Sequence, residues 1–538
     1  MTISDYQAHR TQDPCGVPEF IDFGDGFSTF DFVESRFGAR PSIHRCFSLA
    51  RATNKCKTVV IEKIAPIGLI ADENADFVAN GYFTGADIYR ISFFKSLCAN
   101  VAELHGLDDT SLLGYVIVKL DGKDVAHAKW RVFEAVLEKY DHPHNCVANP
   151  GCYDVGVCGR RFEIEGVLYC QQNSLTNACA HVALRSLLSR IVPERDVAYS
   201  EMNAVAAPLA DGGASAFFPG KGLSCPQIKS ILMRYGVTFK DVDYCKAEKL
   251  DGFGGIREAL PYQKIAYSGV ESGYGALVGF NMPDPANPNK VARHIIPFYG
   301  HTFNKDTWVS DAETCYFDLG GAGYIPSECW TSSFIGHDDN FGCNFCIPRL
   351  YITPQKVDYV VELQKPGVTL SGTMAEAAAF SVLPELVKYI DSSNDWQKRF
   401  EIAFKSPIAK VILRSVCVSP DEYFKHLGEM RDWNGNVEHP VLATEFSRLA
   451  KWPANFWVVE VSLPQLFPAN ERKLGEIVLD ASCPLDYSRL NYAMPALLFA
   501  RLPGSYFVRN ITPDGNVRFR MWNSNIKSHV AVLRCGCK

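Results

Sequence analysis

A cysteine stands where an amphipathic helix is expected to begin, directly after a loop rich in amide side chains. The loop covers residues 169–178, and Cys179 follows it. The apolar residues after Cys179 recur three and four positions apart, which predicts a helix with one buried face: Ala180, Ala183, Leu184, Leu187, Leu188 and Ile191. The free N–H groups and positive dipole end of a helix start favour a thiolate. Cys179 is therefore a candidate nucleophile, although a cysteine in isolation is more often a small core residue.

A second segment supplies a base and an acid for this cysteine. Residues 270–280 and 294–311 alternate as expected for a strand, a loop and then a strand pair that turns near residues 304–306. His294 opens the first strand of the pair, and Asp311 ends the second. Antiparallel pairing would bring the two side chains together.

These residues resemble the papain-like cysteine peptidase superfamily, particularly its bacterial peptidase C39-like members. The resemblance covers about residues 161–318 and rests on a glutamine, a cysteine that starts a helix, a histidine that opens a strand and an acid on the next strand. It implies that Cys179 is the nucleophile, that His294 is the general base and that Asp311 orients the imidazole.

The resemblance also implies an oxyanion hole made by the Gln172 amide and the backbone N–H of Cys179. Gln172 lies seven residues before the cysteine, and Asn173 lies six before it, which is the usual spacing in the superfamily. Either amide could serve. The reaction implied is cleavage of a peptide or isopeptide amide through a thioester acyl-enzyme.

Two other histidines compete for the role of base. His301 lies seven residues after His294, and an odd offset on one strand places the two rings on opposite faces. His181 lies two residues after Cys179, so its ring points away from the thiol on a helix. We expect His181 to be a capping or core residue, and the spacing to Asp311 favours His294 over His301.

The length of 538 residues predicts two to four domains. We expect an α+β chain with a mixed α/β region at residues 1–150, a papain-like core at residues 151–350 and an α+β region at residues 366–538. In that core, the cysteine helix packs on an antiparallel sheet that carries the histidine and the acid.

Local patterns predict the following elements outside the candidate site. Strands are expected at residues 57–63, 114–120, 162–169, 456–462 and 475–480, with a hairpin around 513–515. Helices are expected at residues 130–140, 224–236 and 375–390, and a further helix follows a capping box at Ser419. Glu460 and Asp480 are single carboxylates in apolar strands, and we expect both to face the surface.

Composition excludes several classes of protein. The net charge is −6 without long runs of one sign, which gives no electrostatic footprint for nucleic acid. The first residues lack the basic start and apolar run of a secretory signal, and no stretch approaches the ~18 apolar residues of a membrane span. We therefore expect a cytoplasmic protein that binds neither nucleic acid nor a membrane, and the resemblance to cysteine peptidases implies a protein or peptide substrate.

Two groups of cysteines raise a zinc hypothesis. The first offers five soft ligands within a loop: His142, His144, Cys146, Cys152 and Cys158. The second is the pair Cys343 and Cys346, with Cys315 and Cys329 upstream. Neither group has two C-x2-C pairs, so both remain hypotheses. The predicted catalytic site itself needs no metal and no cofactor.

Two alternatives to a hydrolase stay open. The same order of Cys, His and Asp serves transglutaminase-like and arylamine acetyltransferase-like enzymes, in which an amine accepts the acyl group. A non-catalytic interaction protein could also retain the fold, with Cys179 as an unreactive thiol.

Overall fold

The computed structural model describes residues 3–138, 145–173, 175, 179–193, 196–209, 222–244, 260–284, 287–303, 323–352, 356–406, 410–439, 453–485, 493–511 and 517–534. Helices account for 32% of the residues and strands for 36%, so the chain is mixed α+β as expected, with several antiparallel sheets. It divides into two compact units that interleave along the sequence. Unit 1 comprises residues 1–237, 277–299 and 335–347, and unit 2 comprises residues 238–276, 300–334 and 348–538. Three consecutive regions were expected instead.

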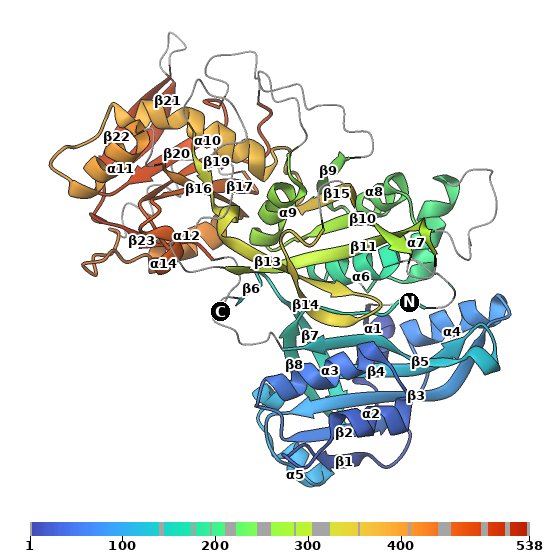
Figure 1. Ribbon diagram of the computed structural model, residues 1–538. Coiled ribbons are helices and arrows are strands. Elements are labelled where there is room, and N and C mark those ends of the chain that lie inside the picture. The colour runs from blue at the N-terminus through green and yellow to red at the C-terminus, as the bar shows by residue number, and fades with distance from the viewer. Residues whose placement is uncertain are drawn as a thin grey trace. The chain divides into compact units, whose positions relative to one another are not determined.

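Unit 1 begins with a five-stranded antiparallel sheet in the order β1-β2-β3-β4-β5. Its strands are β1 (Glu19–Asp22), β2 (Thr58–Lys63), β3 (Phe83–Phe94), β4 (Leu112–Gly122) and β5 (Lys129–Leu137). The helices of this part are α1 (Ile3–Thr11), α2 (Thr29–Phe37), α3 (Pro41–Ala52), α4 (Leu69–Ala79) and α5 (Val101–His105). α2 and α3 lie against the sheet, and their apolar residues form one core with it (Figure 1).

Residues 130–140 were expected to form a helix, and this prediction was wrong. Residues 129–137 form β5, which pairs with β4 along its length. The apolar spacing fits a helix, but Val132, Phe133 and Val136 also suit a strand, and pairing with a neighbouring strand outweighs the local preference. Glu134 lies on this strand and is fully buried.

The rest of unit 1 carries the candidate site. It contains the hairpin β7 (Gly151–Val157) and β8 (Arg160–Gly166), the short β6 (Asn145–Cys146), and the helices α6 (Cys179–Ile191), α7 (Tyr199–Ala206) and α8 (Cys225–Arg234). The strands β14 (Gly342–Pro348), β13 (Thr331–Asp338), β11 (Asn287–Phe303) and β10 (Ala276–Asp284) follow one another across a sheet, and their residues 277–284, 287–299, 335–338 and 342–347 belong to unit 1. Residues 270–275 were expected to be part of a strand, but residues 262–271 form a helix and β10 begins at Ala276.

Unit 2 contains a seven-stranded sheet in the order β12-β16-β17-β19-β20-β21-β22, antiparallel except for the β12–β16 pair. These strands are β12 (Ile325–Pro326), β16 (Ile412–Val418), β17 (Phe456–Ser462), β19 (Gly475–Asp480), β20 (Leu497–Leu502), β21 (Ser505–Ile511) and β22 (Val517–Asn523). The other elements are β9 (Thr238–Asp243), β15 (Val357–Gln364), β18 (Arg472–Lys473), β23 (Val530–Ala531), α9 (Tyr262–Glu271), α10 (Gly372–Val387), α11 (Asp395–Lys405), α12 (Pro420–Glu429) and α14 (Phe467–Asn470).

Helix starts and strands of unit 2 follow the sequence closely. The capping box at Ser419 is present, with the Glu422 side chain returning to the Ser419 backbone. β17 and β19 form where expected, and β21 and β22 form the predicted hairpin, although residues 513–515 themselves lie outside the described residues. These patterns are local, which is why the sequence alone predicts them.

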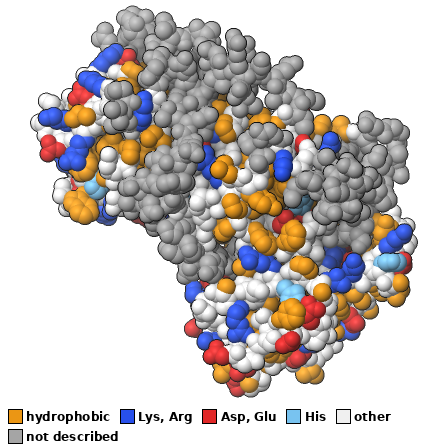
Figure 2. Space-filling view, in the orientation of Figure 1, with side chains coloured by type: hydrophobic (Ala, Val, Ile, Leu, Met, Phe, Trp, Pro, Cys, Tyr) orange, Lys and Arg blue, Asp and Glu red, His pale blue; other side chains and the backbone are white. Residues whose placement is uncertain are grey.

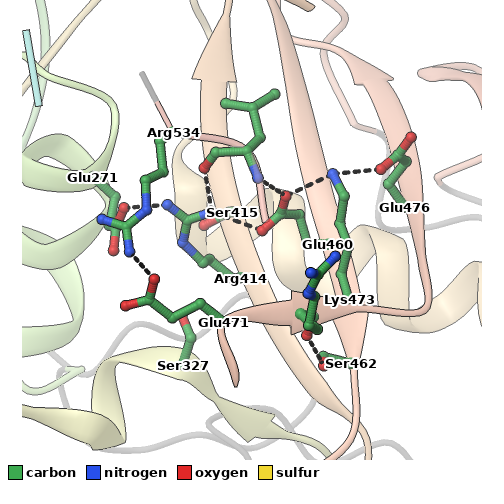
Figure 3. A network of polar contacts seen from close by, with 12 residues as sticks. Glu271, Ser327, Arg414, Ser415, Glu460, Ser462, Glu471, Lys473, Glu476 and Arg534 are labelled. Carbon is green, nitrogen blue, oxygen red and sulfur yellow. Dashed lines mark hydrogen bonds and ion pairs between the residues drawn. The ribbon is translucent and has the colours of Figure 1, made fainter. Parts of the chain in front are cut away.

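Glu460 was expected to face the surface, and this prediction was wrong. Glu460 is 1% exposed and lies in a chain of buried ion pairs across the sheet of unit 2 (Figure 3). Arg414 contacts Glu460 at 2.7 Å and Glu271 at 2.5 Å, and Lys473 contacts Glu460 at 2.7 Å and Glu476 at 2.6 Å. Each buried charge thus has an opposite charge beside it, which offsets the cost of removing it from water.

Glu362 of β15 supplies a pH dependence to unit 2. Its side chain is buried, and Oε1 accepts a hydrogen bond from Ser268 Oγ at 2.9 Å. Burial raises the pKa of Glu362 to about 7, so the folded chain holds a proton there that the unfolded chain loses near pH 4.5. The stability contributed by this proton is present below about pH 4.5 and is lost as the pH rises towards 7.

We expect the wild type to lose roughly 3 kcal/mol relative to Glu362→Gln between pH 4.5 and pH 8. Glutamine keeps the hydrogen bond to Ser268 and has no proton to lose. Urea unfolding of both proteins across this range measures the difference, with Glu385→Gln on the surface as a control. Parallel stability curves for the wild type and Glu362→Gln would contradict the prediction.

Two surface properties complete the description. Among the described residues, no helix is both long and apolar enough to cross a membrane. Positively and negatively charged side chains are interspersed over the described part of the face in Figure 2.

Candidate functional site

Cys179 is the first residue of α6, as the sequence predicts, and its side chain is partly exposed. The apolar residues that follow are buried, which fixes the helix against unit 1: Ala180, Ala183, Leu184, Leu187 and Leu188. The thiol therefore lies at the amino end of a helix, next to backbone N–H groups that have no partner within the helix.

The loop before Cys179 is held by β5. Tyr169 and Ala135 exchange two backbone hydrogen bonds of 2.8 Å, and Val132 N donates to Gln171 Oε1 at 3.0 Å. The loop thus continues the edge of the five-stranded sheet. This contact exists only because residues 129–137 form a strand rather than the expected helix.

Buried ion pairs fix the far side of α6. Arg185 contacts Glu134 of β5 at 2.7 Å and Asp196 at 3.4 Å. Arg10 of α1 contacts the same two carboxylates at 2.7 and 2.8 Å. Because all four groups are buried, a shift of α6 would leave charges unpaired. The network therefore restrains the position of Cys179.

His294 of β11 lies beside Cys179. The Cys179 sulfur, one ring nitrogen of His294 and one carboxylate oxygen of Asp339 all lie within 4.8 Å of one another. Burial alone would lower the pKa of His294, but hydrogen bonds with Asp338 and Cys179 and the nearby Asp339 raise it to about 10. The charged imidazolium is therefore favoured beside the thiol.

Asp338, at the end of β13, holds the imidazole. Its Oδ2 lies 3.2 Å from His294 Nε2, and its Oδ1 accepts backbone hydrogen bonds from Asn340 at 2.9 Å and Phe341 at 3.2 Å. Burial by itself raises the pKa of Asp338, but the hydrogen bond from His294 and the two from the backbone lower it. Asp338 is thus an ionised carboxylate in a fixed orientation.

The close approach of β13 to β11 depends on a glycine. A Cβ at Gly336 would lie 2.8 Å from the Pro297 carbonyl oxygen and 3.0 Å from Ile296. A larger residue would push the strands apart. The turn after β13 is also held from outside the sheet, because Ser42 Oγ of α3 donates to the Asn340 carbonyl at 3.2 Å.

The second carboxylate, Asp339, is almost fully buried and lies 3.5 Å from His294 Nε2. Burial raises its pKa to about 6, with the neighbouring Asp338 charge acting in the same direction and His294 opposing it. Asp339 lines a small pit, called here the Cys179 pit, together with Cys170, Cys179, Ser186, Ile295 and His337.

The Cys170 thiol and the His337 imidazole, which also line the pit, are uncharged near neutral pH. Burial raises the pKa of the Cys170 thiol to about 12. Burial lowers the pKa of His337 to about 3; its Nδ1 accepts from Asn344 N at 3.2 Å and its Nε2 lies 3.3 Å from the Val167 carbonyl. Cys179 in the pit and the neighbouring His294 are thus the pair suited to nucleophile and base.

The two amides proposed for the oxyanion hole differ in their surroundings. Gln172 Nε2 donates to Asn340 Oδ1 at 3.3 Å, and Asn340 Nδ2 donates to Asp339 Oδ1 at 3.4 Å, so Gln172 belongs to the same polar cluster. Asn173 is buried, and its Nδ2 donates to Glu73 at 2.7 Å. Gln172 is the amide that stays beside the site.

The sequence assigned the orienting role to Asp311, which lies outside the described residues. It missed Asp338 and Asp339. The signal available was the run Asp338-Asp339-Asn340 followed by Gly342, which marks a turn between two apolar strands. Nothing local indicates that this turn lies beside His294, because 44 residues separate Asp338 from it.

The rival histidines lie elsewhere. His301 is buried in unit 2, where its Nε2 lies 2.8 Å from Glu271 Oε1. His181 is a core residue as expected; its Nε2 lies 2.7 Å from Asn203 Oδ1, and burial lowers its pKa to about 4. Of the three candidates, only His294 lies beside Cys179.

Among the described residues, the cysteines of each group are not gathered around one point as a shared zinc ion would require. Cys152 and Cys158 flank most of β7, and six residues of strand span roughly 20 Å. Cys343 and Cys346 lie three apart on β14, where an odd offset points the side chains to opposite faces; Cys343 is buried and Cys346 exposed. His142, His144 and Cys315 lie outside the described residues.

Comparison with known proteins found no relative of this chain. No family model, no curated protein and no solved structure matches this chain. Functional arguments therefore rest on the chemistry of the site.

Proposed function

We propose that the chain is a cysteine-nucleophile enzyme that cleaves a peptide or isopeptide amide through a thioester. The observation that carries the proposal is the placement of Cys179 at the start of α6, with His294 beside it and Asp338 on the imidazole. A nucleophile, a base and a group that orients the base are the parts that acyl transfer needs.

In the proposed mechanism, His294 takes the Cys179 proton and the thiolate attacks the amide carbonyl carbon. Asp338 keeps the imidazolium oriented and charged, which agrees with the raised pKa of His294. The backbone N–H of Cys179 and the Gln172 amide would receive the developing oxyanion. His294 then gives its proton to the leaving amine, and water releases the acid from the thioester.

The order of the catalytic elements along the chain supports this proposal, with one residue different from the one that the sequence predicted. The cysteine helix comes first and the histidine strand second, as in the superfamily the sequence resembles. We assign the orienting role to Asp338 on β13, the neighbour of β11, in place of Asp311. The acceptor stays open between water and an amine, because both would approach the same thioester.

Trapping the acyl-enzyme tests this function. The protein is incubated with a tryptic peptide library and hydroxylamine, and we expect peptide hydroxamates to form because hydroxylamine cleaves thioesters. Cys179→Ala should give none, whereas Cys346→Ala, which removes an exposed thiol outside the site, should match the wild type. A peptide library left unchanged by the wild type would argue against amide cleavage. Repeating the reaction with glycinamide in place of hydroxylamine shows whether an amine accepts the acyl group.

A further inference from the structure

A buried carboxylate oxygen in the Cys179 pit has no use in the proposed reaction. Asp339 is 4% exposed, and among the residues that the structure describes its Oδ2 has no hydrogen-bond partner. Its Oδ1 accepts one long hydrogen bond, from Asn340 Nδ2 at 3.4 Å, and lies 3.5 Å from His294 Nε2. A buried carboxylate oxygen that has no partner among the protein's own groups is available to a bound group or ion.

The atoms around this oxygen have the chemistry of metal ligands. A thiolate sulfur, an imidazole nitrogen and a carboxylate oxygen from Cys179, His294 and Asp339 lie within 4.8 Å of one another. Donors that share a tetrahedral zinc ion lie roughly 3.3–3.8 Å apart, given bond lengths of ~2.0–2.3 Å. The 3.5 Å between His294 Nε2 and Asp339 Oδ1 already matches this separation.

We propose that Cys179, His294 and Asp339 form a reversible zinc site that blocks the nucleophile. Sulfur and imidazole donors select zinc over magnesium and calcium. Three protein ligands leave a fourth position for water. On binding, bonds form from zinc to the Cys179 sulfur, a His294 ring nitrogen and an Asp339 carboxylate oxygen; waters leave the hydrated ion, and one proton of the Cys179–His294 pair passes to the buffer. The binding stands on the geometry alone, whereas the inhibition rests on the proposed acyl-transfer function.

Binding is tested with reduced, metal-free protein by calorimetric titration with zinc chloride. The wild type should bind one equivalent that Cys179→Ala and His294→Ala do not bind. Asp339→Asn should weaken binding at least about 10-fold, since loss of even an outer-shell partner typically costs about 10- to 100-fold. Cys346→Ala controls for an exposed thiol and should bind as the wild type does.

Cobalt(II) gives a second readout that does not depend on activity. A thiolate-to-cobalt charge-transfer band should appear in the wild type and vanish in Cys179→Ala. Retention of the band or of the bound equivalent in Cys179→Ala, or unchanged affinity in Asp339→Asn, would overturn the proposal.

The inhibition is tested by labelling. Zinc should slow the alkylation of Cys179 by iodoacetamide, and a chelator should restore the rate. If Cys179 reacts slowly without zinc, the acyl-transfer proposal fails while the titration still decides on the ion. If Cys179 reacts quickly and zinc changes nothing, the zinc site is wrong and the nucleophile stands.

Discussion

Replacing His294 by asparagine should slow the alkylation of Cys179 at pH 7 by roughly 10- to 30-fold. An ordinary cysteine is only about 3% thiolate at this pH, given a pKa near 8.5. In the proposed mechanism His294 takes the Cys179 proton, so removing the ring should return Cys179 to the reactivity of an ordinary cysteine. Amide cleavage should fall further, by about 10²- to 10⁴-fold, because the general base is also lost.

Timed labelling with iodoacetamide followed by peptide mass spectrometry measures this rate. The exposed Cys15 serves as a reference thiol within the same protein. His301→Asn is the matched control, since His301 contacts Glu271 in unit 2, and its change should stay within about 2-fold. Equal losses in both variants, or a loss in His301→Asn alone, would refute the choice of His294. A slow Cys179 in the wild type would favour the interaction-protein alternative.

Replacing Arg414 by methionine should destabilise unit 2 by roughly 3–5 kcal/mol. Arg414 lies between the buried carboxylates Glu271 and Glu460, and it also donates to the Leu533 carbonyl at 2.8 Å (Figure 3). Methionine fills similar space, but Glu271 on one side and Glu460 on the other both lose their arginine partner. The loss is large because the charges left behind are buried.

Urea unfolding monitored by tryptophan fluorescence measures this effect. Trp130 is the one tryptophan among the eight in the sequence that falls in unit 1, so the signal reports mainly on unit 2. Lys388→Met is the control, because Lys388 and Glu385 form an exposed pair, and its loss should cost under about 1 kcal/mol. A cost for Arg414→Met no greater than that of the control would show that the network does not stabilise the fold.

Much of the local structure follows from the sequence. The start of α6 at Cys179 follows from the apolar spacing after it, and the start of α12 follows from the capping box at Ser419. These signals involve residues within one or two helical turns, so they need no knowledge of the rest of the chain. A strand carrying His294 was predicted in the same way, although it begins at Asn287 and not at His294 as expected.

Features that depend on distant residues were missed. Residues 129–137 form a strand because β4 pairs with them, although their spacing suits a helix. Glu460 was expected at the surface, but it is buried. Burial alone raises the pKa of Glu460, but the charges of Lys473 and Arg414 lower it by more, so the buried carboxylate stays ionised. A single buried charge is unfavourable, and only its partners across the sheet make it stable.

The residues of the candidate site fall into the same two groups, those that local patterns predict and those that depend on distant contacts. The sequence by itself determined Cys179 at a helix start and His294 on a strand, because helix and strand patterns are written in neighbouring residues. The sequence favoured His294 over His301 through the spacing to Asp311, and only the tertiary structure placed the His294 ring beside the thiol and brought Asp338 and Asp339 to it. The physical reason is that hydrogen bonds and charge pairs between side chains act over a few ångströms of space, whereas these residues are tens of positions apart in the chain.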